Sequence, residues 1–139
     1  MKLTKLKTNV LSNLLAGVKL NKIEDKKVKV NLLKTYLSLH KISNDFETDR
    51  AAIAQKFQQD WGKVMSEIDV LRKENKPIPD SYNKYLEAEK DANQMIKELS
   101  EEEVTVEIIP VSADSFLEAV EDDITLNTVS FLMENGILE

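Results

Sequence analysis

The chain has 139 residues, a formal net charge of −6, no cysteine, and only three glycines and three prolines. The absence of cysteine excludes disulfide bonds, thiolate zinc sites and cysteine nucleophiles. So few glycines and prolines are typical of long helices joined by few turns, and this length is that of one domain. We therefore expect a single, mainly α domain that covers residues 1–139.

Charge is sorted along the chain. Residues 1–41 contain ten lysines and two acids, a formal +8, whereas residues 98–139 contain twelve acids and no lysine or arginine, a formal −12. Residues 42–97 are nearly neutral, with nine basic and eleven acidic side chains. A basic first segment and an acidic last segment indicate either charged partners or contact between the two ends of the chain.

The first elements are short. Residues 1–5 form either a short strand or the lead into a helix. From Leu6 the apolar residues recur at helical spacing, which predicts a helix with Thr8 as its N-cap and Gly17 as its left-handed end. Residues 18–22 then read as a connection.

A much longer helical pattern begins near residue 24 and meets no proline before residue 77. A single helix of that extent would be about 80 Å long. The pattern predicts either one exposed, coiled-coil-like helix or two helices broken once. We favour a break at residues 42–45, where Ser43, Asn44 or Asp45 would cap a new helix.

Pro77 and Pro79 give the clearest interruption of helical structure in the sequence. Asp80 or Ser81 then caps a third helix that extends to about residue 99. Because a short loop makes two helices antiparallel neighbours, residues 46–75 should pack against residues 81–99. Residues 24–99 are therefore predicted to form a long helical hairpin.

The pattern changes after residue 100. Residues 104–109 alternate and are rich in β-branched side chains, which predicts a strand that ends at Pro110. A strand needs a partner, and the other extended candidates are residues 1–5 and residues 18–20. Pairing with either would bring the acidic last segment beside the basic first segment.

Two short helices complete the prediction. The first covers about residues 113–121, with Ser112 or Asp114 as its cap, and the second covers about residues 125–135. Thr125 caps the second helix and Gly136 follows its end. Residues 100–139 should thus form an acidic strand–helix–helix unit that packs on the N-terminal segment.

The residues that carry enzyme chemistry are sparse. His40 is the single histidine, and it reads as a half-buried structural residue rather than a general base. The glycines are too scattered to build a phosphate loop, and no serine lies in a nucleophile elbow. We expect no catalytic residue and no cofactor, so the chain is predicted not to be an enzyme.

Metal binding is also weakly indicated. Residues 45–49 imitate the start of a calcium loop, but Arg50 and Lys56 stand where that loop needs a glycine and a glutamate. The acidic runs 101–103 and 121–123 read as solvated faces, because carboxylates adjacent in sequence seldom converge on one cation. We therefore expect no metal site.

Two groups of residues are candidates for binding a partner. Lysines at the start of the long helix could contact phosphates or the acids of a partner, but no arginine or aromatic residue lies among them, so nucleic acid is the weaker alternative. An aromatic pair on the apolar stripe is either core or part of an interface, and a homodimer would cover it. These residues are Lys19, Lys22, Lys26, Lys27, Lys29 and Lys34 in the first group, and Phe57 and Trp61 in the second.

The order of segments resembles a family of small uncharacterised proteins of tailed bacteriophages and prophages. The resemblance covers most of the chain but contains no specific motif and no functional residue that can be carried over. It lies in Met1-Lys2-Leu3-Thr4, Asn9-Val10-Leu11-Ser12-Asn13-Leu14-Leu15, Val30-Asn31-Leu32-Leu33-Lys34 and Glu101-Glu102-Glu103-Val104. The resemblance implies a phage or prophage setting and a non-enzymatic role.

The sequence thus predicts an interaction or assembly protein that binds a protein partner or a second copy of itself. The alternative is a nucleic-acid-associated regulator that uses the basic N-terminal region. No apolar run is long enough to cross a membrane, so we expect no membrane partner and a location in the cytoplasm, that of the host cell if the chain is phage-encoded.

Overall fold

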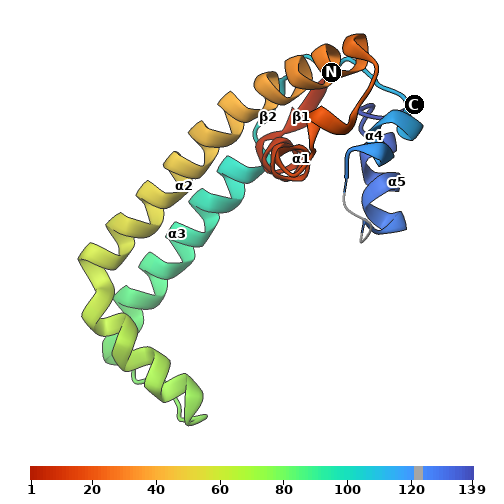
Figure 1. The fold of residues 1–139 in the computed structure, drawn as a ribbon. Coiled ribbons are helices and arrows are strands. Elements are labelled where there is room, and N and C mark those ends of the chain that lie inside the picture. Colours follow the sequence, from red (N-terminus) through yellow and green to blue (C-terminus); the bar gives the residue numbers. More distant parts are fainter. Residues whose placement is uncertain (121–123) are drawn as a thin grey trace. The chain divides into compact units, whose positions relative to one another are not determined.

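The computed structural model describes residues 1–120 and 124–139, and it confirms a mainly α fold (Figure 1). The 3₁₀ turns Leu20–Lys22 and Asp80–Tyr82 precede its second and third helices. Among the described residues, no helix combines the length and apolar character that crossing a bilayer requires. The elements in chain order are β1 (Lys2–Thr4), α1 (Lys5–Ala16), α2 (Lys26–Lys73), α3 (Asn83–Glu101), β2 (Glu103–Thr105), α4 (Ala113–Glu118) and α5 (Leu126–Glu134).

The chain forms two compact units. Residues 1–45 and 102–139 make up the first, which we call the terminal unit, and residues 46–101 make up the second, the hairpin unit. The boundary between residues 45 and 46 falls within α2, so the terminal unit is built from two stretches of sequence that the hairpin unit separates.

Helix α1 starts earlier than the sequence predicts. Its N-cap is Thr4, whose side-chain oxygen accepts a hydrogen bond from the Lys7 backbone N–H at 3.1 Å. The predicted cap, Thr8, lies inside the helix, where its hydroxyl donates to the Thr4 carbonyl oxygen at 2.9 Å. Gly17 ends α1 with a φ of −82°, which is right-handed, so the predicted left-handed end is wrong.

Helix α2 is continuous from Lys26 to Lys73, so the favoured break at residues 42–45 is wrong. The polar residues that suggested a cap have other partners: Asn9 Nδ2 donates to Ser43 Oγ at 2.8 Å, and Asn44 Nδ2 lies 3.1 Å from His40 Nε2. The true start of α2 is capped by Asp25, whose Oδ1 accepts from the Lys27 backbone N–H at 2.9 Å.

Antiparallel packing of the second half of α2 and α3 forms the hairpin unit, as the prolines predict (Figure 1). Helix α3 begins at Asn83 rather than at residue 81, because residues 80–82 form the 3₁₀ turn. The buried side chains of this unit are only Phe46, Ile68 and Tyr85.

The two short strands confirm the first of the two predicted pairings. β1 and β2 are antiparallel, with Leu3 opposite Val104. The pairing continues past β2, where the Val106 N–H donates to the Met1 carbonyl oxygen at 2.9 Å, and an ion pair joins Lys5 to Glu102. The basic first segment and the acidic last segment therefore meet here through a strand pair.

β2 ends at Thr105, which lies opposite Lys2, so the strand is shorter than the predicted span 104–109. Beyond it the chain runs along α2 and uses hydroxyl groups of that helix instead of a strand. Glu107 N–H donates to Ser38 Oγ at 2.9 Å, and Ile109 N–H donates to Thr35 Oγ1 at 2.9 Å.

The last residues pair with a nearby segment that the sequence did not reveal. The Val111 N–H donates to the Ile137 carbonyl oxygen at 3.0 Å, and the Glu139 N–H donates to the Val111 carbonyl oxygen at 3.0 Å. The predicted Thr125 cap is confirmed, and Gly136 lies beyond the end of α5 as predicted, with a φ of 77°. The predicted acidic run 121–123 lies outside the described residues.

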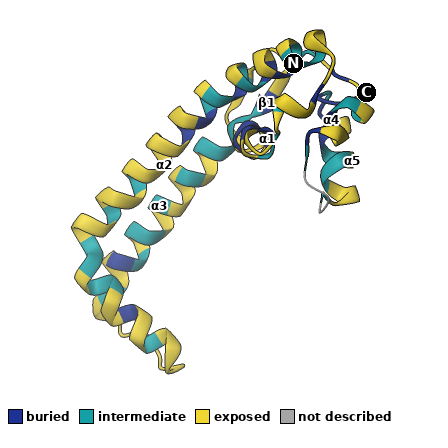
Figure 2. Cartoon of the chain, viewed as in Figure 1, coloured by how far each residue is buried: buried dark blue, intermediate teal, exposed yellow. Residues whose placement is uncertain are grey.

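The core of the terminal unit collects apolar side chains from both stretches of its sequence. Figure 2 shows buried positions on α1 and on the first half of α2. The buried cluster contains Leu3, Leu11, Leu15, Ile23, Leu32, Leu39, Val106, Val111, Phe116, Ala119, Leu132, Ile137 and Leu138.

Candidate interaction surfaces

The predicted lysines divide between a loop and a helix. Lys19 and Lys22 lie in the connection between α1 and α2, and the Lys19 backbone N–H donates to the Ala119 carbonyl oxygen at 2.8 Å. The other four lie on α2, where Lys29 is half-buried and the rest are exposed: Lys26, Lys27 and Lys34. Helical spacing places Lys27 and Lys34 on one face of α2 and Lys29 away from them.

The sequence reasoning missed the apolar side chains among these lysines. Val30, Leu33 and Leu37 are 41%, 42% and 55% exposed, although they lie on a helix whose opposite face is packed in the core (Figure 2). Large apolar side chains gathered on a solvent face make this a candidate interaction surface. The sequence does contain a signal for this surface: a second set of apolar residues, spaced three or four apart and out of phase with the buried set.

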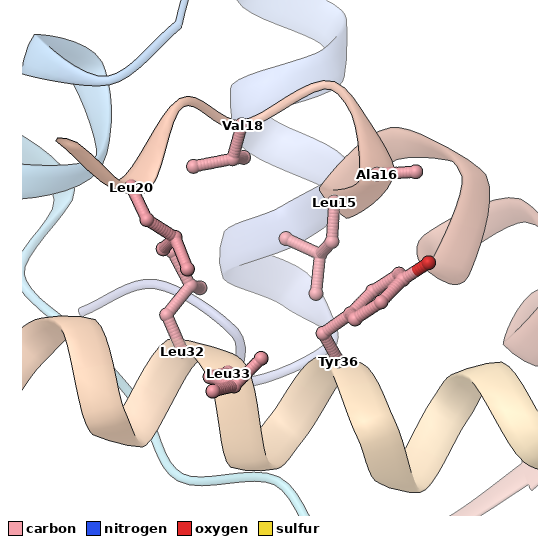
Figure 3. A pocket seen from close by; sticks show the side chains of 7 residues that line it. All are labelled: Leu15, Ala16, Val18, Leu20, Leu32, Leu33 and Tyr36. Atoms are coloured by element: carbon pink, nitrogen blue, oxygen red, sulfur yellow. The ribbon is translucent and has the colours of Figure 1, made fainter. Parts of the chain in front are cut away.

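Beside this face, α1, α2 and the connection between them enclose a small cavity of about 170 Å³ (Figure 3). Its lining is apolar except for the Tyr36 hydroxyl, and it contains no group that titrates near neutral pH. Such a cavity holds apolar groups but supplies no acid or base. Its lining residues are Leu15, Ala16, Val18, Leu20, Leu32, Leu33 and Tyr36.

The predicted aromatic pair lies in the hairpin unit. Phe57 and Trp61 are half-buried, and their rings contact the buried Tyr85 ring at centroid distances of 5.6 Å and 6.0 Å. Contacts of this kind stabilise helix packing beyond the area they bury. The pair is therefore core on one side and surface on the other.

That surface side is an open groove of about 420 Å³ between α2 and α3, which we call the hairpin groove. Its polar rim carries both signs of charge, and Lys56 Nζ lies 3.4 Å from the Asp60 carboxylate. A groove with an apolar floor and a mixed rim accepts an apolar helix face. It is lined by Ala52, Ile53, Lys56, Phe57, Asp60, Trp61, Ala88, Asp91, Ala92 and Met95.

A polar cluster joins α2 to α3. The Arg72 guanidinium donates two hydrogen bonds to the Glu89 carboxylate, at 2.9 Å and 3.1 Å, and the Tyr85 hydroxyl donates to Glu89 at 3.0 Å. The Arg72 bonds hold the pKa of Glu89 below its usual range, whereas burial, followed by the Glu89 bond, raises the pKa of Tyr85. Because every member of the cluster is hydrogen-bonded to another member, we interpret the cluster as stabilising the packing of α2 against α3 rather than as a substrate site.

Within residues 1–120 and 124–139, no three histidine, cysteine, aspartate or glutamate side chains gather in a way that could hold a metal ion. His40, the one imidazole, stacks on Tyr36 at a centroid distance of 5.0 Å.

No known protein family, curated protein or solved structure matches this chain.

Proposed function

We propose that this chain is a non-enzymatic interaction or assembly protein whose hairpin unit binds a second copy of itself through the hairpin groove. The observation that carries the proposal is the half-exposed pair Phe57 and Trp61 on the floor of that groove. Aromatic side chains such as tryptophan and phenylalanine are enriched in protein interfaces, and tryptophan is often among the residues that carry most of the binding energy.

The hairpin unit has little core of its own. Of its 56 residues, only Phe46, Ile68 and Tyr85 are buried. Helices in proteins derive most of their stability from packing of an amphipathic face. A second hairpin in the groove would complete a four-helix bundle and bury that face.

Charge favours a second copy as the occupant. Residues 46–101 carry nine basic and twelve acidic side chains, so two hairpins approach without strong repulsion. A two-fold interface brings the same patch of both copies together and must be self-complementary. The groove meets this condition because Lys56 on one rim and Asp91 on the other have opposite charges.

The test is the mass of the purified chain by light scattering between about 1 and 100 µM, the range over which a dimer with a micromolar Kd forms. We expect a dimer that dissociates on dilution. Met95→Glu places a charge in the groove at a side chain that is 53% exposed, and should weaken the dimer at least about tenfold. Val70→Glu is the matched control, because Val70 is 52% exposed on the same unit but does not line the groove.

A wild-type chain that stays monomeric over this range would contradict self-association. Equal weakening by Met95→Glu and Val70→Glu would place the interface elsewhere on the unit. Circular dichroism of both variants should match the wild type, since both side chains are already half in solvent.

We place this assembly role in a phage or prophage, in the cytoplasm of the host cell, on the resemblance described above. Neighbouring genes would test it. Head or tail genes beside the coding sequence support assembly, whereas replication or early genes support a regulator.

A nucleic-acid-associated regulator is the second candidate, and one observation favours it. Helix α2 carries no acid before Asp45, and Lys27 and Lys34 lie on one exposed face. If this candidate is right, binding to duplex DNA should fade steeply as salt rises, because counterion release drives it. We expect little binding at physiological salt, since neither arginine nor aromatic side chains flank these lysines on α2's exposed face.

A further inference from the structure

The solvent face of α2 in the terminal unit carries apolar residues at heptad spacing, separate from the apolar residues that α2 buries in the core. Val30 and Leu37 are seven residues apart, Leu33 lies between them, and all three are exposed. In coiled-coil notation Val30 and Leu37 take position a and Leu33 takes position d. One flank of this seam holds position e, which is lysine three times in succession: Lys27, Lys34 and Lys41.

We propose that this seam, the α2 stripe, binds an amphipathic helix of a partner protein that carries acidic residues beside its apolar face. The proposal concerns the terminal unit and goes beyond self-association of the hairpin unit, so either can hold without the other. The stripe consists of Lys27, Val30, Leu33, Lys34, Leu37 and Lys41.

The stripe is held in place before any partner arrives. The opposite face of the same turns is buried, with Leu32 2%, Thr35 1% and Leu39 0% exposed. Thr35 also accepts the hydrogen bond from Ile109 that ties α2 to the last part of the chain. A helix fixed in this way loses little conformational freedom on binding, which favours affinity.

The second flank of the stripe, position g, holds Tyr36, Ser43 and the half-buried Lys29. The Tyr36 hydroxyl lies 3.2 Å from His40 Nδ1, and Asn44 Nδ2 lies 3.1 Å from His40 Nε2, so these side chains bond along the helix. The three exposed lysines therefore lie on one flank, whereas the other flank has one half-buried lysine. A partner helix meets an apolar seam with more positive charge on one side, which favours one orientation of an acidic helix.

Charge complementarity identifies the partner as acidic. Within the described residues, Lys27, Lys34 and Lys41 have no ion pair, and α2 carries no acid before Asp45. Carboxylates on a facing helix would pair with all three lysines at heptad spacing. Exposed ion pairs are individually weak, so the charges select the partner while the apolar seam supplies most of the affinity.

The pattern fits a helix better than a lipid surface or DNA. An amphipathic helix that lies on a membrane needs a wide apolar face, whereas the stripe is a narrow seam with lysines on one side. Phosphates on DNA would meet half-exposed leucines between the lysines, and these side chains have no favourable contact there.

The test uses a fluorescent designed peptide of about three heptads, with leucine or isoleucine at positions a and d and glutamate at positions e and g. A matched peptide has lysine in place of glutamate. Fluorescence anisotropy with the full chain should give a micromolar Kd for the acidic peptide and at least about tenfold weaker binding for the basic one. Equal binding of the two peptides would overturn the proposal.

Charge reversal separates this surface from a general electrostatic effect. The triple variant Lys27→Glu, Lys34→Glu and Lys41→Glu should lose the acidic peptide and gain the basic one. A triple reversal at exposed lysines of the hairpin unit makes the same change in net charge and should keep the original preference. Its positions are Lys63, Lys73 and Lys90.

The apolar seam is tested separately. Leu37→Gln should weaken the acidic peptide at least about tenfold and leave the circular dichroism unchanged, because Leu37 is 55% exposed. Retained binding in this variant would overturn the proposal. So would tighter binding of phosphatidylserine vesicles or of duplex DNA than of the acidic peptide at physiological salt, since either would identify a different class of ligand.

Discussion

Leu3 is the residue through which the start of the chain stabilises the terminal unit. It is 6% exposed, lies opposite Val104 in the strand pair and belongs to the buried cluster. Truncation of a buried leucine costs about 2–5 kcal/mol, since it removes apolar contacts and leaves a cavity. We therefore expect Leu3→Ala to lower the free energy of unfolding of the terminal unit by about that amount.

Salt should matter much less at the same place. The ion pair between Lys5 and Glu102 has side chains that are 23% and 56% exposed. A pair of this kind contributes about 0–1 kcal/mol, and about 0.5 M salt screens most of it. The strand pair and its apolar contacts, rather than the attraction between opposite charges, should hold the two ends together.

Hydrogen exchange of the Val106 backbone amide measures the effect where it occurs, because that N–H donates to the Met1 carbonyl oxygen. Trp61, the only tryptophan, reports the hairpin unit by fluorescence and should change little in Leu3→Ala. Leu126→Ala is the control, since Leu126 is 84% exposed. The reasoning is refuted if salt accelerates exchange of Val106 more than Leu3→Ala does.

Two further predictions concern single groups. The pKa of Glu89 is lowered in the folded chain by Arg72, so its contribution to stability is complete above the unfolded pKa and is lost as pH falls through the folded value. Unfolding of the hairpin unit in urea, followed by Trp61 fluorescence, should lose stability below about pH 5, and this loss should be smaller in Glu89→Gln. Gly136→Ala should lower the melting temperature, because a φ of 77° strains any side chain and its Cβ would lie 2.9 Å from Met1 Cε. An unchanged melting temperature would show that the turn can relax.

The features that depend on local chemistry were predictable from sequence. Pro77 and Pro79 fix the turn of the hairpin because proline removes backbone donors, and Thr125 and Gly136 bound α5 because capping uses residues within a few positions. The pairing of residues 1–5 with the later strand was one of two alternatives, since few extended segments were available.

Features that depend on distant partners were not predictable in the same way. Ser43 looks like a cap in the sequence, but Asn9, which lies 34 residues away, satisfies its hydroxyl, and α2 continues. The pairing of Val111 with Leu138 involves too few residues to leave a pattern. Of the residues on the two proposed surfaces, the sequence pattern singles out Phe57 and Trp61 but not Leu33 and Leu37, because these two leucines are out of phase with the buried apolar pattern of α2.

The interrupted sequence of the terminal unit sets the order in which the chain can fold as it is synthesised. Residues 46–101 are contiguous, so the hairpin can form as soon as they leave the ribosome. β1 is synthesised first but cannot pair until residues 103–105 have been synthesised, and Val111 cannot form its hydrogen bonds until Ile137 has been synthesised. Contacts so far apart in sequence form slowly. During that wait the lysine-rich first segment and the leucines of α1 are exposed to whatever else the cell contains, which makes this the stage most prone to misassembly.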